Sequence, residues 1–330
     1  MPAIANGKFV ILGGASQIGS HIAEQLLAGG AREVVLLDNL SLGSAEPLQP
    51  LLADPRCRFV RGDVLRLNEL FDPMAGADGV FAVAGIMAST ILENPWMSLD
   101  VNIRGVQNAL EACRYQKVPK IVLSSSAGVY GVMQDDAVTE DTPLRWQAAP
   151  PQLVLYSASK IIGESLAQMA HARGGPQWVA LRYSAVYGPR QHRRAVMGGH
   201  IAESCLRVRR GEGPFIDGDG RQVQDYVYVG DVARANLMAM QSEVSGEGIN
   251  IVGGEDTSQA RIVELVLQAA GSSVTPEYRP YVVTRLPPVT KVGLNREKAL
   301  RLLGWEPEVS IEQGVRNVLR WVDADLAQSV

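Results

Sequence analysis

Tyr156 and Lys160 are the two residues whose types and spacing best fit acid–base chemistry. They are four positions apart, about one turn of a helix, so both side chains can face the same cleft. A free tyrosine has a pKa of about 10 and is a poor base at neutral pH. A neighbouring ammonium group favours the phenolate, which can then take a proton from a hydroxyl. Because this spacing also occurs on the solvated faces of exposed helices, the surrounding residues must decide between the two interpretations.

Three serines are the next candidates. Ser124, Ser125 and Ser126 follow the strand-like run KIVL (120–123), and Tyr156 follows Ser126 after thirty residues. A serine hydroxyl at the end of a strand can hydrogen-bond the reacting oxygen and hold it in place. Ser124 and Ser125 could instead cap backbone groups.

A glycine-rich turn, 13–19, joins the β-rich run 8–12 to a helical pattern of apolar residues. Glycines at such a turn let the backbone approach a pyrophosphate. The helix N-terminus then supplies free N–H groups and the positive end of its dipole. By itself the motif is weak, since it could be an ordinary tight turn.

Asp38 ends a predicted second strand about twenty residues after this turn, where an acidic residue can hold the ribose 2′-OH of NAD. A 2′-phosphate there would face a carboxylate, and no arginine follows in 39–41, so the sequence favours NAD over NADP. The alternative is a solvated strand end. With NAD as cofactor, hydride would leave the carbon whose hydroxyl gives its proton to Tyr156.

Strand and helix patterns alternate through the first half of the chain. Continuous apolar strands between amphipathic helices predict βαβ units and a parallel sheet. We expect strands at 8–12, 33–38, 58–60, 79–84, 120–124 and 178–183, and helices near 18–27, 100–113 and 157–170. The predicted fold is α/β, with a doubly wound parallel sheet of the Rossmann type and a smaller mixed α/β substrate lobe.

Glycine and proline become dense after about residue 184, which indicates a change of organisation. The strand-like segments 226–229 and 249–252 suggest that the two parts are interleaved. We expect an NAD-binding domain at 1–183, with 221–252 joining its sheet. The substrate-binding lobe would comprise 184–220 and 253–330.

The composition is that of a soluble globular protein, with 46% hydrophobic and 20% charged residues. A net charge of −4 gives no support to nucleic-acid binding. Cys57, Cys113 and Cys205 are far apart, and the four histidines show no metal-binding spacing, so neither disulfides nor a metal site is expected. No apolar run approaches membrane-spanning length, and a cytoplasmic location is expected.

Taken together, these motifs resemble the extended short-chain dehydrogenase/reductases, within them the NAD-dependent epimerase/dehydratase family and its UDP-glucose 4-epimerase-like members. The segments that carry the resemblance are GGASQIG (13–19), the strand ending in Asp38, GDV (62–64), SSSAGVYG (124–131) and YSASK (156–160). It covers nearly the whole chain, as far as LGW (303–305). The resemblance implies that Ser126, Tyr156 and Lys160 are the catalytic residues.

The resemblance also implies where the cofactor lies. Asp63 and Val64 would lie at the adenine, 82–85 along the cofactor, and Asn102 would support the site. The expected NAD-binding residues are Gly13, Ser16, Gln17, Ile18, Gly19, Asp38, Asn39, Asp63, Val64, Ala82, Ala84, Asn102, Ser124, Tyr156, Lys160 and Tyr183. Ser16 replaces the usual glycine of the family, and it is small enough for the turn to survive.

Two segments, 181–190 and 218–231, resemble the stretches of the family that close over a sugar nucleotide. Ala185 stands where the family usually has asparagine, and Gln224 where it has arginine; in the nucleotide-sugar enzymes both of those side chains touch the substrate diphosphate. A neutral glutamine cannot replace a charge-assisted arginine–phosphate bond, so the usual grip is weakened. The expected substrate-binding residues are Met87, Ser126, Ala185, Arg221, Gln224 and Arg279. Other arginines (190, 193, 194, 207, 209 and 210) could supply replacement cations or form a solvated face.

The leading hypothesis is an NAD-dependent sugar epimerase that acts at C4 of a nucleotide sugar through transient hydride transfer. The rival is an NAD-dependent dehydrogenase or reductase of a sugar, a sugar acid or a less polar alcohol that lacks a nucleotide, and Ala185 and Gln224 favour it. A third possibility, a non-catalytic NAD-sensing protein, conflicts with the intact Ser126, Tyr156 and Lys160. Elimination of water is not expected, because Ala127 and Gly128 offer no acid. The resemblance implies a homodimer that pairs through 100–114 and 157–170.

Overall fold

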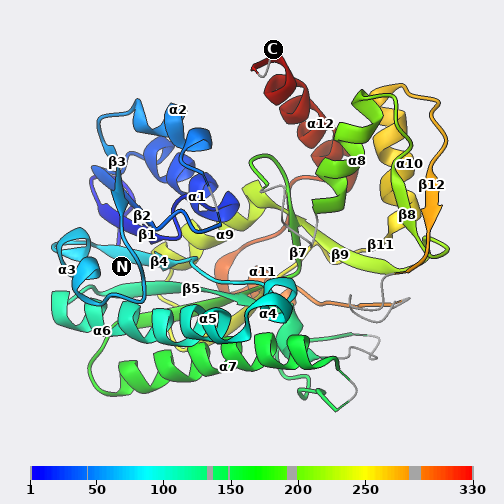
Figure 1. Cartoon of the computed structure of the whole chain (residues 1–330). Coiled ribbons are helices and arrows are strands. Elements are labelled where there is room, and N and C mark those ends of the chain that lie inside the picture. Colours follow the sequence, from blue (N-terminus) through cyan, green and yellow to red (C-terminus); the bar gives the residue numbers. More distant parts are fainter. Residues whose placement is uncertain are drawn as a thin grey trace.

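A computed structural model describes residues 2–42, 44–131, 137–147, 149–191, 199–281 and 291–328 (Figure 1). Within these ranges, a seven-stranded parallel sheet has the strand order β10-β6-β5-β4-β1-β2-β3. Its strands are β1 (Lys8–Leu12), β2 (Glu33–Asp38), β3 (Cys57–Arg61), β4 (Gly79–Ala82), β5 (Lys120–Ser126), β6 (Gln177–Tyr183) and β10 (Glu247–Ile251). The predicted Rossmann-type α/β fold is therefore confirmed.

Helices cover both faces of this sheet, which explains why its central strands are apolar throughout. One face packs against α1 (Gln17–Ala28), α2 (Gln49–Leu52), α9 (Val229–Gln241) and α11 (Glu297–Leu303). The other face packs against α3 (Asn68–Met74), α6 (Val106–Gln116) and α7 (Pro151–Ala172), and Figure 1 shows α6 and α7 side by side below the sheet. The side chains of β1 are buried along its whole length.

Shorter helices lie in the connections. They are η1 (Glu46–Leu48), α4 (Ala88–Glu93), α5 (Pro95–Leu99), the π-helix η2 (Asp100–Gly105) and the 3-10 helix η3 (Ala127–Tyr130). The helix expected at 100–113 is thus a π-helical turn followed by α6. Single π-helical turns are often found at functional sites, and η2 carries Asn102.

A second group of elements forms the smaller lobe, at the upper right of Figure 1. Its sheets contain β7 (Ala185–Tyr187), β9 (Val223–Tyr228) and β11 (Asp256–Ser258), and separately β8 (Phe215–Asp217) and β12 (Glu277–Arg279). Its helices α8 (Gly199–Arg209), α10 (Gln259–Ala270) and α12 (Ile311–Gln328) pack against one another. Their apolar faces enclose a separate core that includes Ile201, Ile262 and Val315.

Only part of 221–252 returns to the main sheet. β10 forms its edge beside β6, as expected, whereas β9 pairs with β7 and β11 in the three-stranded sheet. The chain leaves the main sheet after β6, so β7 lies outside that sheet. β9 then pairs in parallel with β7 and stays outside it as well. The proposed boundaries of the two domains stay a prediction.

Candidate active site

Helix α7 carries Tyr156 and Lys160 on consecutive turns. The helix begins at Pro151, six residues before the predicted start at 157, because proline is well tolerated at the first helical position. Tyr156 therefore lies inside the helix, and the Lys160 Nζ atom is 5.6 Å from the centre of its ring. The predicted one-turn spacing of the pair is confirmed.

Ser126 is the last residue of β5 and faces this pair. Its hydroxyl oxygen accepts a hydrogen bond from the Gly128 backbone N–H at 3.0 Å, and the hydroxyl also hydrogen-bonds Tyr156. The structure thus brings Ser126, Tyr156 and Lys160 together at the carboxyl end of β5. In open α/β sheets ligands bind outside the carboxyl ends of the strands, so this position suits a reaction centre.

Burial acts on the pKa values of both side chains. It raises the pKa of Tyr156 above its usual range, and the hydrogen bond from Ser126 partly offsets this effect. Burial lowers the pKa of Lys160 to about 8, against the opposing field of Glu164. The protein alone therefore favours a protonated Tyr156 at neutral pH, and a further positive charge at the site would be needed to favour the phenolate.

The other two serines of β5 also have defined partners. The Ser124 carbonyl accepts a hydrogen bond from Lys160 Nζ at 2.9 Å, and the Ser124 hydroxyl lies 3.3 Å from the Tyr183 hydroxyl. Tyr183 is buried and also bonds to Asn236. Ser125 turns away from this group and donates to a carboxylate oxygen of Glu164 at 2.6 Å. Only Ser126 of the three contacts Tyr156 among the described hydrogen bonds.

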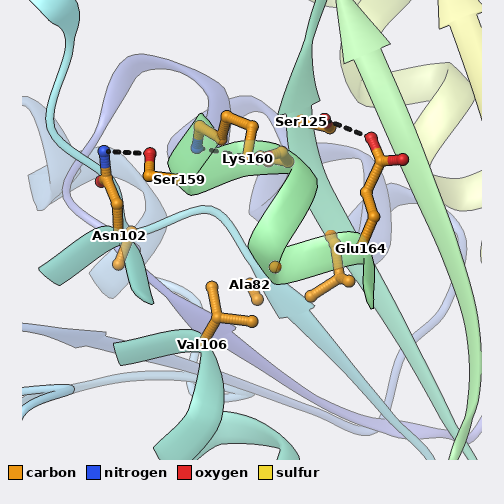
Figure 2. A pocket seen from close by; sticks show the side chains of 11 residues that line it. Ala82, Asn102, Val106, Ser125, Ser159, Lys160 and Glu164 are labelled. Atoms are coloured by element: carbon orange, nitrogen blue, oxygen red, sulfur yellow. Dashed lines mark hydrogen bonds between the residues drawn. The ribbon is translucent and has the colours of Figure 1, made fainter. Parts of the chain in front are cut away.

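Asn102 connects the loop after β4 to α7. Its side-chain amide accepts from the Ile86 N–H at 2.7 Å, donates to the Ile86 carbonyl at 2.9 Å, and donates to the Ser159 hydroxyl at 3.2 Å (Figure 2). This fixes the loop on which Gly85 and Met87 lie, and Met87 immediately precedes α4. The expectation that Asn102 supports the site agrees with this position, and its contact with NAD stays a prediction.

The turn between β1 and α1 leaves no room for a side chain at Gly13, where the diphosphate of a dinucleotide is expected. Gly13 has a φ of +83°, and a Cβ atom there would lie 2.6 Å from the Ala84 nitrogen. Ser16 caps α1, since its hydroxyl donates to the Gly13 carbonyl at 2.7 Å and accepts from the Gly19 N–H at 3.1 Å. The turn therefore survives the serine, and the start of α1 fits a diphosphate. Ile18 packs against the main core.

Asp38 lies where β2 ends, beside the turn. Its carboxylate accepts from the Ala15 N–H at 3.0 Å and from the Leu40 N–H at 2.8 Å. Burial raises its pKa, and these two bonds act in the opposite direction. A carboxylate has about four acceptor positions, so capacity remains for ribose hydroxyls. The residues present thus fit NAD.

The expected adenine region is also assembled. Asn39 donates to the Asp63 carboxylate at 3.2 Å, and Asp63 accepts from the Leu65 N–H at 2.9 Å. Val64 is buried, and a small cavity beside it is also lined by Ala82 and Ala84. β1 and β4 are neighbours although β2 follows β1 in sequence, so the expected cofactor residues lie around the point where the strand order reverses.

Apart from Ser126 at the end of β5, the expected substrate residues lie in the smaller lobe and on the loop after β4. Ala185 is buried in β7, and Gln224 lies in β9 opposite Thr257. The Arg221 side chain is 83% exposed and pairs with Asp219 at 2.6 Å. Arg279 pairs with Asp217, and its guanidinium lies 4.3 Å from the ring centre of Phe215. Their contact with a substrate stays a prediction.

Three of the other arginines already have acidic partners. Arg190 pairs with Glu24, Arg207 with Glu212 and Glu277, and Arg209 with Asp323. Residues 193 and 194 lie outside the described ranges. Ion pairs on the surface explain these three arginines without a ligand.

Two features of the site were missed from the sequence. Glu164 forms a buried ion pair with Arg182 directly behind Lys160, and its position one turn after Lys160 was the available signal. The Gln17 side chain, expected only at the cofactor, donates to the Gly188 and Pro189 carbonyls at 2.9 and 3.2 Å. Nothing in the local sequence links positions so far apart along the chain.

Comparison with known proteins identifies the family. Residues 9–252 match the model of the NAD dependent epimerase/dehydratase family. The UDP-glucose 4-epimerase of Mycolicibacterium smegmatis is 30% identical over 319 residues, which cover 95% of this chain and 98% of that protein. The chain therefore belongs to the NAD-dependent epimerase/dehydratase family.

Solved structures give the same result. The UDP-glucose 4-epimerase of Thermotoga maritima with UDP-glucose has a TM-score of 0.86 and 30% identity, covering 97% of this chain and 99% of that one. The UDP-glucuronic acid 4-epimerase of Bacillus cereus, in complex with UDP-glucuronic acid and NAD, has a TM-score of 0.82 and 28% identity, covering 96% and 99%. The protein is an NAD-dependent enzyme, as the sequence predicted. Over the residues that the structure describes, no helix is long and apolar enough to cross a bilayer.

Proposed function

We propose that this enzyme is a nucleotide-sugar 4-epimerase that uses Ser126, Tyr156 and Lys160 as its catalytic residues. The observation that carries the proposal is the meeting of these three side chains at the carboxyl end of β5, on the same edge of the sheet as the glycine turn after β1 and Asp38 at the end of β2. The 4-epimerase names of relatives that match over nearly the full length support the same reaction.

In this proposal Tyr156 takes the proton from the C4 hydroxyl of the sugar and later returns it. Ser126 holds the same oxygen through its hydroxyl, while the Lys160 ammonium, anchored on the Ser124 carbonyl, favours the phenolate of Tyr156. Bound NAD would accept a hydride from C4 and give it back on the opposite face. Gly13, Gly19 and the α1 N-terminus would hold its diphosphate.

The substrate side departs from what a diphosphate requires. The buried Ala185 has no side-chain amide to offer a diphosphate, and the neutral Gln224 has no positive charge. These two residues favour a second candidate, an NAD-dependent dehydrogenase or reductase of a sugar, sugar acid or less polar alcohol without a nucleotide. Both candidates use the same proton transfer at Tyr156 and differ in whether NADH is released.

Incubation with NAD and a panel of UDP-, GDP- and dTDP-sugars separates the two candidates. Sugar configuration is followed by NMR, and NADH by its absorbance. A C4 epimer without accumulation of NADH is the expected result, whereas steady accumulation of NADH without an epimer would overturn the epimerase proposal. Tyr156→Phe is the control, and we expect it to bind NAD while losing most of its turnover.

We further propose that the enzyme is a homodimer that pairs through α7 and its neighbouring helices. Leu155, Ile162 and Met169 are exposed at seven-residue intervals along one face of α7. Leu92 and the 80%-exposed Trp96 extend this apolar surface on α4 and α5, which pack against α7. Sedimentation should give twice the chain mass, and Ile162→Glu should give monomers. A monomeric wild type at micromolar concentration would refute the proposal.

A further inference from the structure

Glu164 is a buried carboxylate one helical turn beyond Lys160. Its side chain is only 10% exposed, and its hydrogen bonds run to Ser125 on β5 and Arg182 on β6. One oxygen, Oε1, accepts from the Ser125 hydroxyl at 2.6 Å and from Arg182 Nε at 3.0 Å, and Oε2 accepts from Arg182 Nη2 at 2.7 Å. Such a bidentate pair with arginine holds the carboxylate in position and favours its ionised form.

The partners of Glu164 are themselves held in place. Arg182 lies on β6 and donates to the Tyr130 hydroxyl at 3.0 Å, and Tyr130 donates to the Asn250 side chain at 2.7 Å. Ser125 belongs to the same strand as Ser126. The carboxylate is therefore set by two strands of the main sheet and by the catalytic helix, and has little freedom to move.

Glu164 and Lys160 line the same small cavity behind the site. The cavity has a volume of about 10 Å³ and also borders Asn102, Ser125 and Ser159. In Figure 2, the Glu164 carboxylate points to Ser125 on one side of this group, while Asn102 and Ser159 meet on the other. Ala82, Ala84, Val106 and Leu123 complete the lining of the cavity, so Lys160 has both polar and apolar neighbours there, and Glu164 is the charged one.

Lys160 is partly buried, and a counter-charge favours its ammonium form there because loss of solvent favours the neutral amine. The groups that face it are Tyr156 and Glu164 from α7, the Ser124 carbonyl from β5 and the neutral Asn102 from η2. Arg182 reaches this region from β6, where it binds the carboxylate of Glu164. Among the described groups, Glu164 is the one whose charge favours the ammonium form of Lys160.

We propose that Glu164 is a positioning residue for this reaction: its fixed carboxylate keeps Lys160 in the ammonium form over the working pH range. The inference rests on the proposed role of Lys160 beside Tyr156. Glu164 acts through Lys160 and has no contact with the reacting atoms. Without its charge, Lys160 should lose its proton at lower pH, and the alkaline limit of activity should move down with it.

The test compares Glu164→Gln with Glu164→Asp. Glutamine keeps the size and one acceptor oxygen but removes the charge, whereas aspartate keeps the charge. The first readout is the NMR titration of ¹³Cε-labelled lysine without substrate, with the Lys160 signal assigned by its loss in Lys160→Met. We expect the titration midpoint to fall by about one pH unit in Glu164→Gln and to stay near wild type in Glu164→Asp.

The second readout is the pH profile of turnover. We expect Glu164→Gln to turn over nearly normally at pH 6.5 and to approach a rate about 10-fold below that of wild type once the pH exceeds the wild-type midpoint of Lys160, with KM unchanged. A merely structural role would lower activity equally at every pH. Because Glu164→Gln leaves Arg182 buried without its partner charge, Glu164→Gln/Arg182→Met serves as a second variant that removes both charges.

A Lys160 midpoint within about 0.2 pH units of wild type in both neutral variants would overturn the proposal. The NMR titration needs no turnover, so it separates this inference from the proposed function. A shifted midpoint in a protein that epimerises no sugar would keep the link between Glu164 and Lys160 and reject the epimerase. Epimerase activity with an unshifted midpoint would keep the epimerase proposal and reject the link between Glu164 and Lys160.

Discussion

The Lys160 ammonium donates to the Ser124 backbone carbonyl at 2.9 Å, so α7, which carries Tyr156, is bonded to the strand that carries Ser126. This bond orients Lys160 while leaving its other two N–H groups for the site. It also means that the distance between the Tyr156 helix and the Ser126 strand depends on a charged side chain.

Lys160→Met should lower kcat by about 100-fold or more, within the range for loss of a group that supports acid–base catalysis. Without the ammonium, the pKa of Tyr156, already raised by burial, rises further, so the acid limb of the kcat profile should move to higher pH. Stopped assays from pH 6 to 10 would check this. An unchanged acid limb would contradict the role given to Lys160.

Gly85→Ala should impair catalysis without unfolding the protein. A Cβ atom at Gly85 would lie 3.1 Å from Lys160 Nζ and 3.4 Å from Asn102 Oδ1, so the ammonium would have to shift from its position. We expect kcat to fall by roughly 10-fold, since small displacements of catalytic groups are costly. Gly163→Ala is the matched control, because its nearest neighbours, the Val106 methyl groups, lie 3.7 Å away or more. Equal activities of the two variants would argue against this steric effect.

Asp38→Ala should reduce the preference for NAD over NADP. The change removes an acceptor for the ribose hydroxyls and the charge that opposes a 2′-phosphate. We expect the ratio of the two dissociation constants to change by about 100-fold, which calorimetry can measure. Glu33→Ala, at the opposite end of β2, should leave the ratio unchanged. A wild-type enzyme that prefers NADP would refute the role of Asp38.

Gln224→Arg combined with Ala185→Asn should improve the use of nucleotide sugars. A charge-assisted bond to a diphosphate contributes about 1.5–3 kcal/mol, so KM for a UDP-sugar should fall by roughly 10-fold or more. KM for a sugar without a nucleotide should not change, which makes it the internal control. If both values of KM rise together, the two positions do not face a diphosphate.

His21 predicts a dependence of stability on pH. Burial lowers its pKa from 6.5 to about 4, so below pH 6.5 the unfolded chain binds a proton that the folded protein refuses until about pH 4. Stability is therefore lost as pH falls through this window, by about 3 kcal/mol from this residue. Urea unfolding of wild type and His21→Gln from pH 7 to 4 should show the variant losing less. The exposed His171 gives the control variant His171→Gln.

The sequence predicted most of the main sheet and the meeting of Ser126, Tyr156 and Lys160. This was possible because alternating apolar strands and helices dictate where the carboxyl ends of the strands meet. The start of α7 was placed too late, since two adjacent prolines suggest a break whereas Pro151 occupies the first helical position.

Long-range pairing explains what could not be predicted. Residues 226–229 look like part of a strand that could join the main sheet, yet β9 pairs with β7, because a local pattern does not identify the partner strand. Glu164 resembles a solvated helix residue in the sequence. Its burial follows from Arg182, which arrives on β6 from another part of the chain.

The side-chain amide of Gln17 has a consequence for how ligands are taken up. It ties the first turn of α1, where the diphosphate of NAD should lie, to the carbonyls of Gly188 and Pro189 just after β7. Glu24 and Arg190 form a second tie between the same two segments. A ligand that orders one of these two segments therefore restricts the other. Binding of the cofactor should raise the affinity for the sugar, and the sugar should raise the affinity for the cofactor by the same factor, because such coupling is reciprocal.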